Sequence, residues 1–228
     1  DDVPQLHCIY TTSNHRPNKM PLHDLCLDGD KIMKVGQDVL DEKIIPKVLG
    51  TFWYSDRAIN QFIQEMKKAY PDSLFIVTGD HGFQCSELQH TSFMKREYTF
   101  RELHSPGLMF HHPEQDKSSQ AGNIIGGHMN ILPTLFELIA PAGFTYYSLF
   151  HSLTEPISQC VTPYHWVNLQ AIGACHEAYY QLLTAQTGAD VLQGIAPYDD
   201  ICDAEKSLTA YLLQHPELLQ PVDALLRR

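Results

Sequence analysis

One apolar segment limits the folds open to this chain more than any other feature. Residues 74–77 (LFIV) are continuous and partly β-branched, a pattern typical of a strand that is covered on both faces, as in a parallel sheet. The run stops at Gly-Asp-His-Gly, residues 79–82. Because ligands in open α/β sheets bind beyond the carboxyl ends of the strands, Asp80 and His81 fall where a functional site is expected.

Asp80 and His81 offer one oxygen and one nitrogen donor, a combination that suits Zn or Mn. Adjacent side chains diverge along an extended chain, but the glycines at 79 and 82 allow a turn that brings both toward one ion. The same residues also fit a plain polar turn in which Asp80 caps the next element. The residues of this stretch alone leave both interpretations open.

The composition narrows the class of protein. The 228 residues are 43% hydrophobic and 19% charged, as in ordinary soluble globular domains. A net charge of -11 with 16 Lys and Arg argues against a nucleic-acid surface, which needs clustered cations. No run approaches the roughly 18 apolar residues of a membrane helix, and the first residues do not resemble a signal peptide. Any anchor or export signal is therefore expected outside this chain.

The six cysteines give no clear pattern. They are scattered without a C-x-x-C pair, which disfavours a zinc knuckle or a thioredoxin-like site. The cysteines do not indicate whether the protein resides in an oxidising or a reducing compartment.

Two further segments extend the predicted sheet. Residues 6–10 form a short apolar run that ends in the polar cluster 11–15 (TTSNH), which predicts a second strand with polar groups at its carboxyl end. From Ser55 to Tyr70, apolar residues recur at helical spacing, with Ser55 or Asp56 as the cap and Pro71 as the stop. A helix followed by a buried strand is half of a βαβ unit. We therefore expect an α/β fold with a mostly parallel sheet flanked by helices.

The rest of the chain alternates between loops and elements. Residues 83–102 have no clear period, 107–110 form a strand candidate, and 117–127 are an exposed connection. A helix is predicted at 130–139, with Asn130 as its cap and Pro133 in its first turn. Beyond it, the pattern predicts one strand at 165–169 and helices near 176–184, 203–213 and 217–226.

Four blocks of sequence occur in an order that points to a family: residues 12–17 (TSNHRP), 54–56 (YSD), 78–82 (TGDHG) and 128–135 (HMNILPTL). Together they resemble the sulfatase branch of the alkaline phosphatase superfamily, and most of all its lipoteichoic acid synthase-like phosphoglycerol transferases. The resemblance covers about residues 6–153. It implies an alkaline phosphatase-like α/β fold.

The resemblance also implies a chemistry. Members transfer a phospho- or sulfo-group in two steps through a covalent intermediate, with a divalent metal, here Mn, Zn, Ca or Mg, of which Mn or Zn is favoured. Asp80 and His81 match the family's metal pair. His15 matches a histidine that contacts the phosphoryl group or its leaving oxygen, a role that suits an imidazolium beside an oxyanion.

Three more residues are assigned to the substrate by the same resemblance. Asn14 belongs to the block of His15, and His90 and Lys95 lie where several sulfatases carry a His and a Lys that face the anion. Two of these candidates have a plainer interpretation: His15 as a loop histidine, and Lys95 beside Arg96 as a solvated basic pair.

Departures from the family pattern also carry information. The family's nucleophile and a further metal-binding carboxylate lie well upstream of the Ser-Asn-His block, whereas only eleven residues precede Thr12 here. The chain thus resembles the C-terminal part of one catalytic domain, without the N-terminal part of the fold. Residues 1–155 would be the metal-site core and 156–228 a helical C-terminal extension. Asn130 stands where the family commonly has Asp, and 150–153 (FHSL) where it often has Gly-x-Ser-Leu.

Two functions of different class follow. The first is a metal-dependent ester hydrolase or transferase: phosphoglycerol or phosphoethanolamine transfer, or phosphodiester or sulfate ester hydrolysis, with this chain alone inactive. The second is a non-catalytic binding module that retains half a metal site; a cytosolic α/β protein with coincidental histidines is a weaker third.

The implied partner is an anionic ester, such as a lipid head group or a glycan, and not a nucleic acid. The implied location is extracytoplasmic, on the periplasmic or cell-surface side of the inner membrane, with membrane segments outside this chain.

Overall fold

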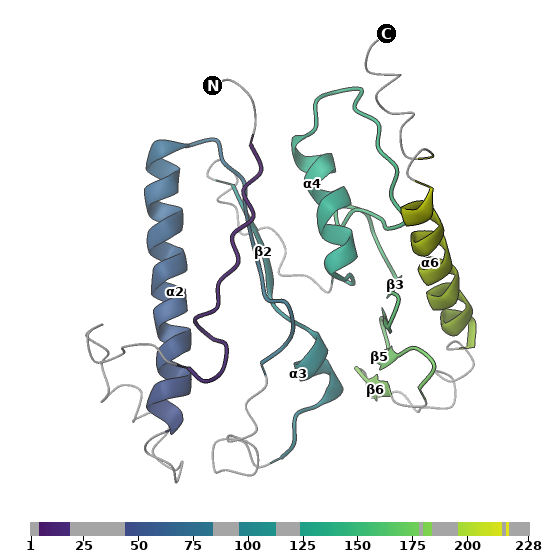
Figure 1. Ribbon diagram of the computed structural model, residues 1–228, viewed down its shortest axis with the longest axis horizontal. Helices are drawn as coiled ribbons and strands as arrows, with labels where there is room; N and C mark the ends of the chain where they lie inside the picture. The colour runs from purple at the N-terminus through teal and green to yellow at the C-terminus, as the bar shows by residue number, and fades with distance from the viewer. Residues whose placement is uncertain are drawn as a thin grey trace. The chain divides into compact units, whose positions relative to one another are not determined.

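The computed structural model describes residues 5–18, 44–83, 96–112, 124–177, 180–183, 196–215 and 218 (Figure 1). Its contacts divide the chain into two compact units, the first comprising Asp1–Tyr98 and Glu102–Lys117 and the second Thr99–Arg101 and Ser118–Arg228. Within the part of the chain that is described, no helix is both long and apolar enough to cross a bilayer.

The first unit is built around the long helix α2 (Ile44–Ala69). Val48 and Ile63 are buried, as expected for the apolar stripe of an amphipathic helix. The helix ends just before Tyr70 and Pro71, because a residue that precedes proline is disfavoured in the helical conformation. The predicted stop is therefore confirmed. The predicted start is wrong: α2 begins at Ile44, so Ser55 and Asp56 lie inside the helix and do not cap it.

A two-stranded sheet completes the first unit. β1 (Phe75–Thr78) confirms the strand predicted at 74–77, and β2 (Leu108–His111) confirms the strand candidate at 107–110. The strands run antiparallel, with Phe75 opposite His111 and Thr78 opposite Leu108. The short helix α3 (Phe100–His104) precedes β2.

The mixed α/β class is confirmed, but the expected parallel pairing is not what the described strands show. The second strand that the sequence predicted at residues 6–10 is not formed, and this segment is exposed, with Leu6 at 71% and Tyr10 at 77% of their full accessibility. β1 pairs instead with β2. The residues of β1 are half-buried or exposed, whereas the apolar run predicted burial on both faces of the strand. The apolar run correctly predicted a strand, but it contained no information about the direction of the partner.

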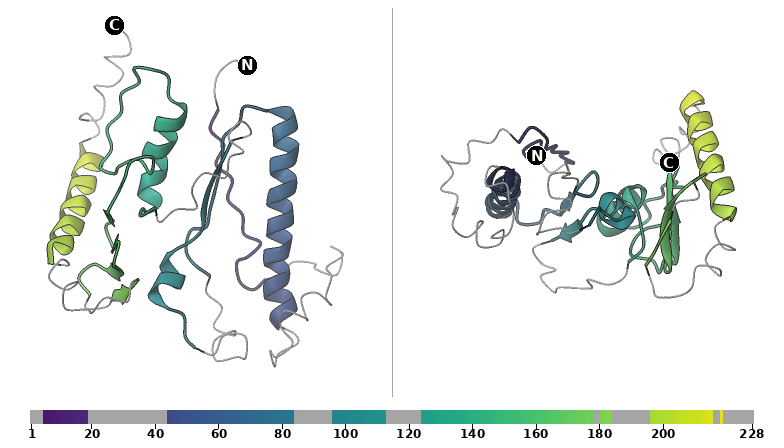
Figure 2. Two further views of the ribbon diagram at one scale, coloured as in Figure 1. Left: turned by 180° about the vertical axis from the view of Figure 1, so that it is seen from behind. Right: turned by 90° about the horizontal axis from the view of Figure 1, so that it is seen from below.

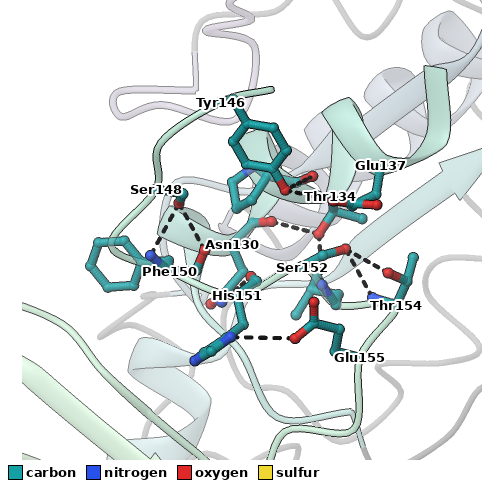
Figure 3. A network of polar contacts seen from close by, with 12 residues as sticks. Asn130, Thr134, Glu137, Tyr146, Ser148, Phe150, His151, Ser152, Thr154 and Glu155 are labelled. Atoms are coloured by element: carbon teal, nitrogen blue, oxygen red, sulfur yellow. Dashed lines mark hydrogen bonds and ion pairs between the residues drawn. The ribbon is translucent and has the colours of Figure 1, made fainter. Parts of the chain in front are cut away.

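The second unit begins with the 3-10 turn η4 (His128–Asn130), which continues into helix α4 (Ile131–Ile139). The predicted helix is confirmed, but Asn130 makes no side-chain cap hydrogen bond to α4. Its side chain instead accepts a hydrogen bond from the Gly127 amide (2.8 Å) and donates one to the His151 carbonyl (2.8 Å). Asn130 therefore joins the helix start to the chain that follows the helix (Figure 3).

Four short strands then form an antiparallel sheet in sequential order: β3 (Gln159–Val161), β4 (His165–Asn168), β5 (Ala171–Ala174) and β6 (Tyr180–Leu182). The helix α6 (Ala196–Gln214) packs beside this sheet (Figure 2). Trp166, which stacks on Tyr198 with ring centroids 5.1 Å apart, lies in the core between them. A disulfide joins Cys175 to Cys202, linking the end of β5 to α6.

The region after residue 155 differs from the helical extension that the sequence predicted. The strand at 165–169 and the helix at 203–213 are confirmed by β4 and α6. The helix near 176–184 is wrong, because residues 180–182 pair with β5 as strand β6. The helix predicted at 217–226 lies outside the described residues, apart from residue 218.

Candidate active site

Strand β1 delivers Asp80 and His81 to an exposed turn. The His81 amide donates a hydrogen bond to Asp80 Oδ1 (3.1 Å), and the ring Nδ1 lies 2.7 Å from the Gly82 carbonyl oxygen. A carbonyl only accepts, so Nδ1 carries the proton and Nε2 keeps its lone pair. The backbone thus fixes the tautomer that leaves Nε2 available as a ligand.

The two side chains fit one divalent cation as a pair of ligands. Nε2 of His81 lies 3.8 Å from Oδ1 of Asp80, and both side chains are more than half exposed. Two donors about 2.1 Å from a tetrahedral ion lie roughly 3.4 Å apart, so a small rotation brings both into range. Among the described residues, no group of three or more His, Cys, Asp or Glu side chains converges in this way. The pair would therefore supply two positions of a coordination sphere.

Helix α3 holds this turn through a close backbone approach at Gly82. The Gly82 amide donates to the Leu103 carbonyl (2.9 Å), and a Cβ added at Gly82 would overlap the Glu102 carbonyl oxygen. Glu102 is held in turn by Arg96, whose guanidinium binds both carboxylate oxygens at 2.7 Å. Glycine is required here for space, so the sequence Asp-His-Gly carries a packing constraint as well as ligands.

His104, at the end of α3, is a neighbour of His81 that no sequence pattern singled out. Burial lowers the pKa of His104, and the positive charge that His81 carries when protonated lowers it further. The lowered pKa favours the uncharged form of His104, which would add no repulsion to a cation beside Asp80 and His81. No motif surrounds His104, and only the packing of α3 against Gly82 reveals it.

His15 and Asn14 lie on a loop that is fastened to α2. The hydroxyl of Ser55 donates to Asn14 Oδ1 (2.8 Å) and lies 3.2 Å from the hydroxyl oxygen of Ser13, and the His15 amide donates to the Thr12 carbonyl (3.0 Å). The His15 ring Nδ1 lies 2.7 Å from the Arg16 carbonyl, so its Nε2 is the acceptor nitrogen. The amide oxygen of Asn14 therefore holds the loop against α2. This structural role comes in addition to the predicted contact with substrate.

Beside His15, this loop and Tyr54 of α2 line a hollow of about 700 Å³ that is open to solvent. The hollow is lined by aromatic, hydroxyl and nitrogen-bearing side chains, with one proline: Tyr10, Thr11, Thr12, Ser13, His15, Arg16, Pro17 and Tyr54.

The structure brings the predicted site residues together in two groups. Asp80 contacts His81, and Asn14 lies beside His15, but no hydrogen bond or ion pair among the described residues joins one group to the other. Residues 6–10 form no strand, so the polar cluster at 11–15 does not lie at the carboxyl end of a strand as the sequence predicted. His90 and Lys95 lie outside the described residues.

Sequence reasoning assigned Ser55 the wrong role. As a supposed helix cap it would serve α2 alone, whereas its buried hydroxyl holds the loop of His15. A usable signal was present, because Ser55 is four residues from both Thr51 and Ile59 and so lies on the same face of a longer helix. A polar residue on that face needs a partner.

Comparison with known proteins adds one finding to this geometry. A sequence model of the family described as Sulfatase matches residues 1–140, which is more than half of the chain and includes all four sequence blocks. No curated protein and no solved structure matches the chain. The chain therefore belongs to the sulfatase family, whose members are sulfo- and phosphoester hydrolases and transferases that generally use a divalent metal.

Proposed function

We propose that Asp80 and His81 bind the divalent metal of a phospho- or sulfo-ester hydrolase or transferase, and that the loop of His15 binds the ester. The observation that carries the proposal is the arrangement at the end of β1. His81 Nε2 keeps its lone pair and lies 3.8 Å from Asp80 Oδ1, at an exposed turn that Gly82 and α3 hold in place. Family membership supports it.

The residues of the chain would divide the work. A bound Mn or Zn ion supplies Lewis-acid stabilisation of the negative charge that develops on the ester. Asp80 and His81 hold and orient that ion. His15, with its Nδ1 hydrogen bonded to the Arg16 carbonyl, presents Nε2 for a proton, and as an imidazolium it hydrogen-bonds the leaving oxygen.

The reaction belongs to one of a few types. Phosphoglycerol transfer, phosphoethanolamine transfer, phosphodiester hydrolysis and sulfate ester hydrolysis all bring a tetrahedral anion to the same set of groups. We propose a lipid head group or a glycan as the carrier of that anion, with membrane attachment through segments outside this chain.

We also propose an extracytoplasmic location. The disulfide between Cys175 and Cys202 supports it, because disulfides persist mainly in oxidising compartments. Cys175 is 8% exposed and Cys202 fully buried, which suits a permanent structural bond.

Metal binding is the direct test. We expect the 228-residue chain to bind Zn²⁺ or Mn²⁺ in isothermal titration calorimetry, and Asp80→Ala or His81→Ala to weaken binding at least about tenfold, as loss of one of two protein ligands implies. Asp72→Ala and His7→Ala are matched surface controls on other segments and should bind as the parent does. Equal affinity in Asp80→Ala and the parent would rule out the site.

Turnover separates the enzyme from the binding module. The chain is assayed with Mn²⁺ or Zn²⁺ against a chromogenic phosphodiester and a chromogenic sulfate ester. Metal-dependent turnover that disappears in Asp80→Ala and falls in His15→Ala supports catalysis by this chain. Metal binding without turnover supports the alternative, a module that binds the ion and the anion but lacks a nucleophile; we predict this second outcome for the chain alone.

A further inference from the structure

Phe83 lies two residues after His81 in the chain and packs between two other aromatic rings. Its ring centroid is 4.9 Å from that of Phe52 and 6.1 Å from that of Tyr98, and both pairs meet edge to face. Such pairs attract each other beyond the apolar area that they bury. The three rings come from α2, from the chain after β1 and from the segment before α3, all in the first unit. This aromatic cluster therefore joins three segments beside the turn of Asp80 and His81.

One peptide group connects the aromatic cluster to His81. The Gly82 carbonyl oxygen, which accepts the hydrogen bond from Nδ1 of His81 at 2.7 Å, belongs to the peptide bond between Gly82 and Phe83. A peptide group is planar, so its carbonyl oxygen turns only when the whole plane turns. Glycine restricts that rotation less than other residues do. An anchor at Phe83 therefore limits the directions that the carbonyl oxygen can take.

The same peptide group is held from both ends. On one side, the Gly82 amide donates a hydrogen bond to the Leu103 carbonyl of α3 (2.9 Å). On the other side, the ring of Phe83 is held by Phe52 and Tyr98. With both ends fixed, the plane between them keeps its carbonyl directed at the ring of His81.

Resting on the metal site proposed above, we propose that Phe83 is a positioning residue: the aromatic cluster orients the Gly82 carbonyl, which keeps the proton of His81 on Nδ1 and leaves Nε2 unprotonated for the metal. Phe83 supplies no ligand atom itself. It acts on affinity through the population of one tautomer, because only His81 with an unprotonated Nε2 is competent to bind. The apparent dissociation constant rises in inverse proportion to that competent fraction.

The tautomer of His81 can be measured without metal. Long-range proton–nitrogen NMR spectra of the isotope-labelled chain, recorded in chelator at alkaline pH, distinguish a ring nitrogen that carries a proton from one that does not. The signals of His81 are those that disappear in His81→Gln. We expect the proton on Nδ1 in the parent and a mixture of both tautomers in Phe83→Ala. An unchanged tautomer in Phe83→Ala overturns the proposal, and so does a parent ring that is protonated on Nε2.

Metal affinity gives the second readout. In isothermal titration calorimetry, Phe83→Ala should weaken Zn²⁺ binding about two- to tenfold, in step with the fraction of His81 that is still protonated on Nδ1. Phe83→Tyr keeps the ring and should restore both the tautomer and the affinity of the parent. A loss of affinity without a change of tautomer would leave Phe83 with a general structural role and contradicts the proposal.

A second variant keeps Phe83 in place. Phe52→Leu removes the closer of its two ring contacts, so it should shift the tautomer in the same direction as Phe83→Ala but by less. Circular dichroism shows whether each variant is folded, and Phe52→Leu decides the question if Phe83→Ala is not. An unchanged tautomer in a folded Phe52→Leu would then overturn the proposal.

Phe62→Ala is the matched control. It removes another exposed phenylalanine of α2, one outside the aromatic cluster, and should keep the tautomer and the Zn²⁺ affinity of the parent. An equal shift in Phe62→Ala and Phe83→Ala would trace the effect to a loosened α2 and contradict the role of Phe83.

The two proposals fail separately, because the tautomer is measured without metal. If the parent binds no Zn²⁺ while Phe83→Ala shifts the tautomer, the metal site is wrong and the control of the His81 tautomer stands. If Asp80 and His81 bind Zn²⁺ and Phe83→Ala leaves the tautomer unchanged, only the role of Phe83 is wrong.

Discussion

Gly82 joins the proposed metal-binding pair, Asp80 and His81, to helix α3. Its amide donates a hydrogen bond to the Leu103 carbonyl, and its own carbonyl accepts one from the His81 ring. A Cβ added at Gly82 would overlap the Glu102 carbonyl oxygen. We expect Gly82→Ala to reduce the free energy of unfolding by about 1 to 3 kcal/mol, the usual cost of overpacking, and to weaken metal binding. Urea unfolding and metal titration measure the two effects.

Gly107 provides the control for that change. It lies immediately before β2, and a Cβ added there meets no atom within 4 Å. Gly107→Ala should therefore change stability by less than about 0.5 kcal/mol. Equal losses in the two variants would show that the close approach at Gly82 is unimportant.

At the residue scale, adjacency in the sequence predicted the candidate site best. Asp80 and His81 are neighbours, so their contact required only that the strand end where the glycines indicate, and it does. The tautomer of His81 and the nearby His104 were not predictable, because both depend on how α3 packs against Gly82.

At the scale of elements, Ser55 couples α2 to the loop of His15. Ser55→Ala and Asn14→Ala each remove the 2.8 Å hydrogen bond, and each should lower stability by about 1 kcal/mol. Because both changes break the same bond, the double variant should lose less than the sum of the single losses. Thermal unfolding of the four proteins gives this coupling. Additive losses, or an equal loss in the control Ser73→Ala, would argue against it.

Thr134 fastens α4 to the chain that follows it (Figure 3). Its buried hydroxyl donates to the Asn130 carbonyl (2.6 Å) and accepts from the Leu153 amide (2.8 Å). Thr134→Val keeps the shape but leaves the Leu153 amide without its partner, and we expect a loss of about 1 to 3 kcal/mol. Thr134→Ser keeps the hydroxyl and should lose less in chemical denaturation. A larger loss of stability in Thr134→Ser than in Thr134→Val would refute this role of the hydroxyl.

The elements show where sequence patterns succeed and fail. Long apolar periods predicted α2 and α6, although α2 begins earlier than its most regular stretch. Residues 176–184 contain many helix-forming residues, yet residues 180–182 pair with β5, because sheet pairing outweighs weak local propensity.

At the scale of the whole molecule, the disulfide covalently links distant parts of the second unit. It joins residues 27 positions apart, and closing a loop of that length stabilises a fold by about 3 to 4 kcal/mol. Cys175→Ala/Cys202→Ala should therefore lower the melting temperature of this unit. Dithiothreitol should lower it in the parent but not in the double variant.

Cys8→Ala is the control for reductant effects on an exposed thiol. It should melt as the parent does and respond to dithiothreitol in the same way. The buried thiol of Cys160 should take no part, because burial raises its pKa to about 11 and leaves very little thiolate at neutral pH. Identical melting of the parent with and without dithiothreitol would exclude a stabilising disulfide.

The sequence by itself determined the α/β class, the strand that ends at Asp80 and His81, and the four blocks that place the chain in the sulfatase family. These features depend on residues that are neighbours in the sequence and on the local spacing of apolar residues. Only the tertiary structure decided that Thr78 lies opposite Leu108 in an antiparallel pair, that Tyr10 and Tyr54 line one hollow, and that Cys175 pairs with Cys202. Such contacts join residues far apart in the chain, and they depend on which surfaces pack together, which local spacing does not encode.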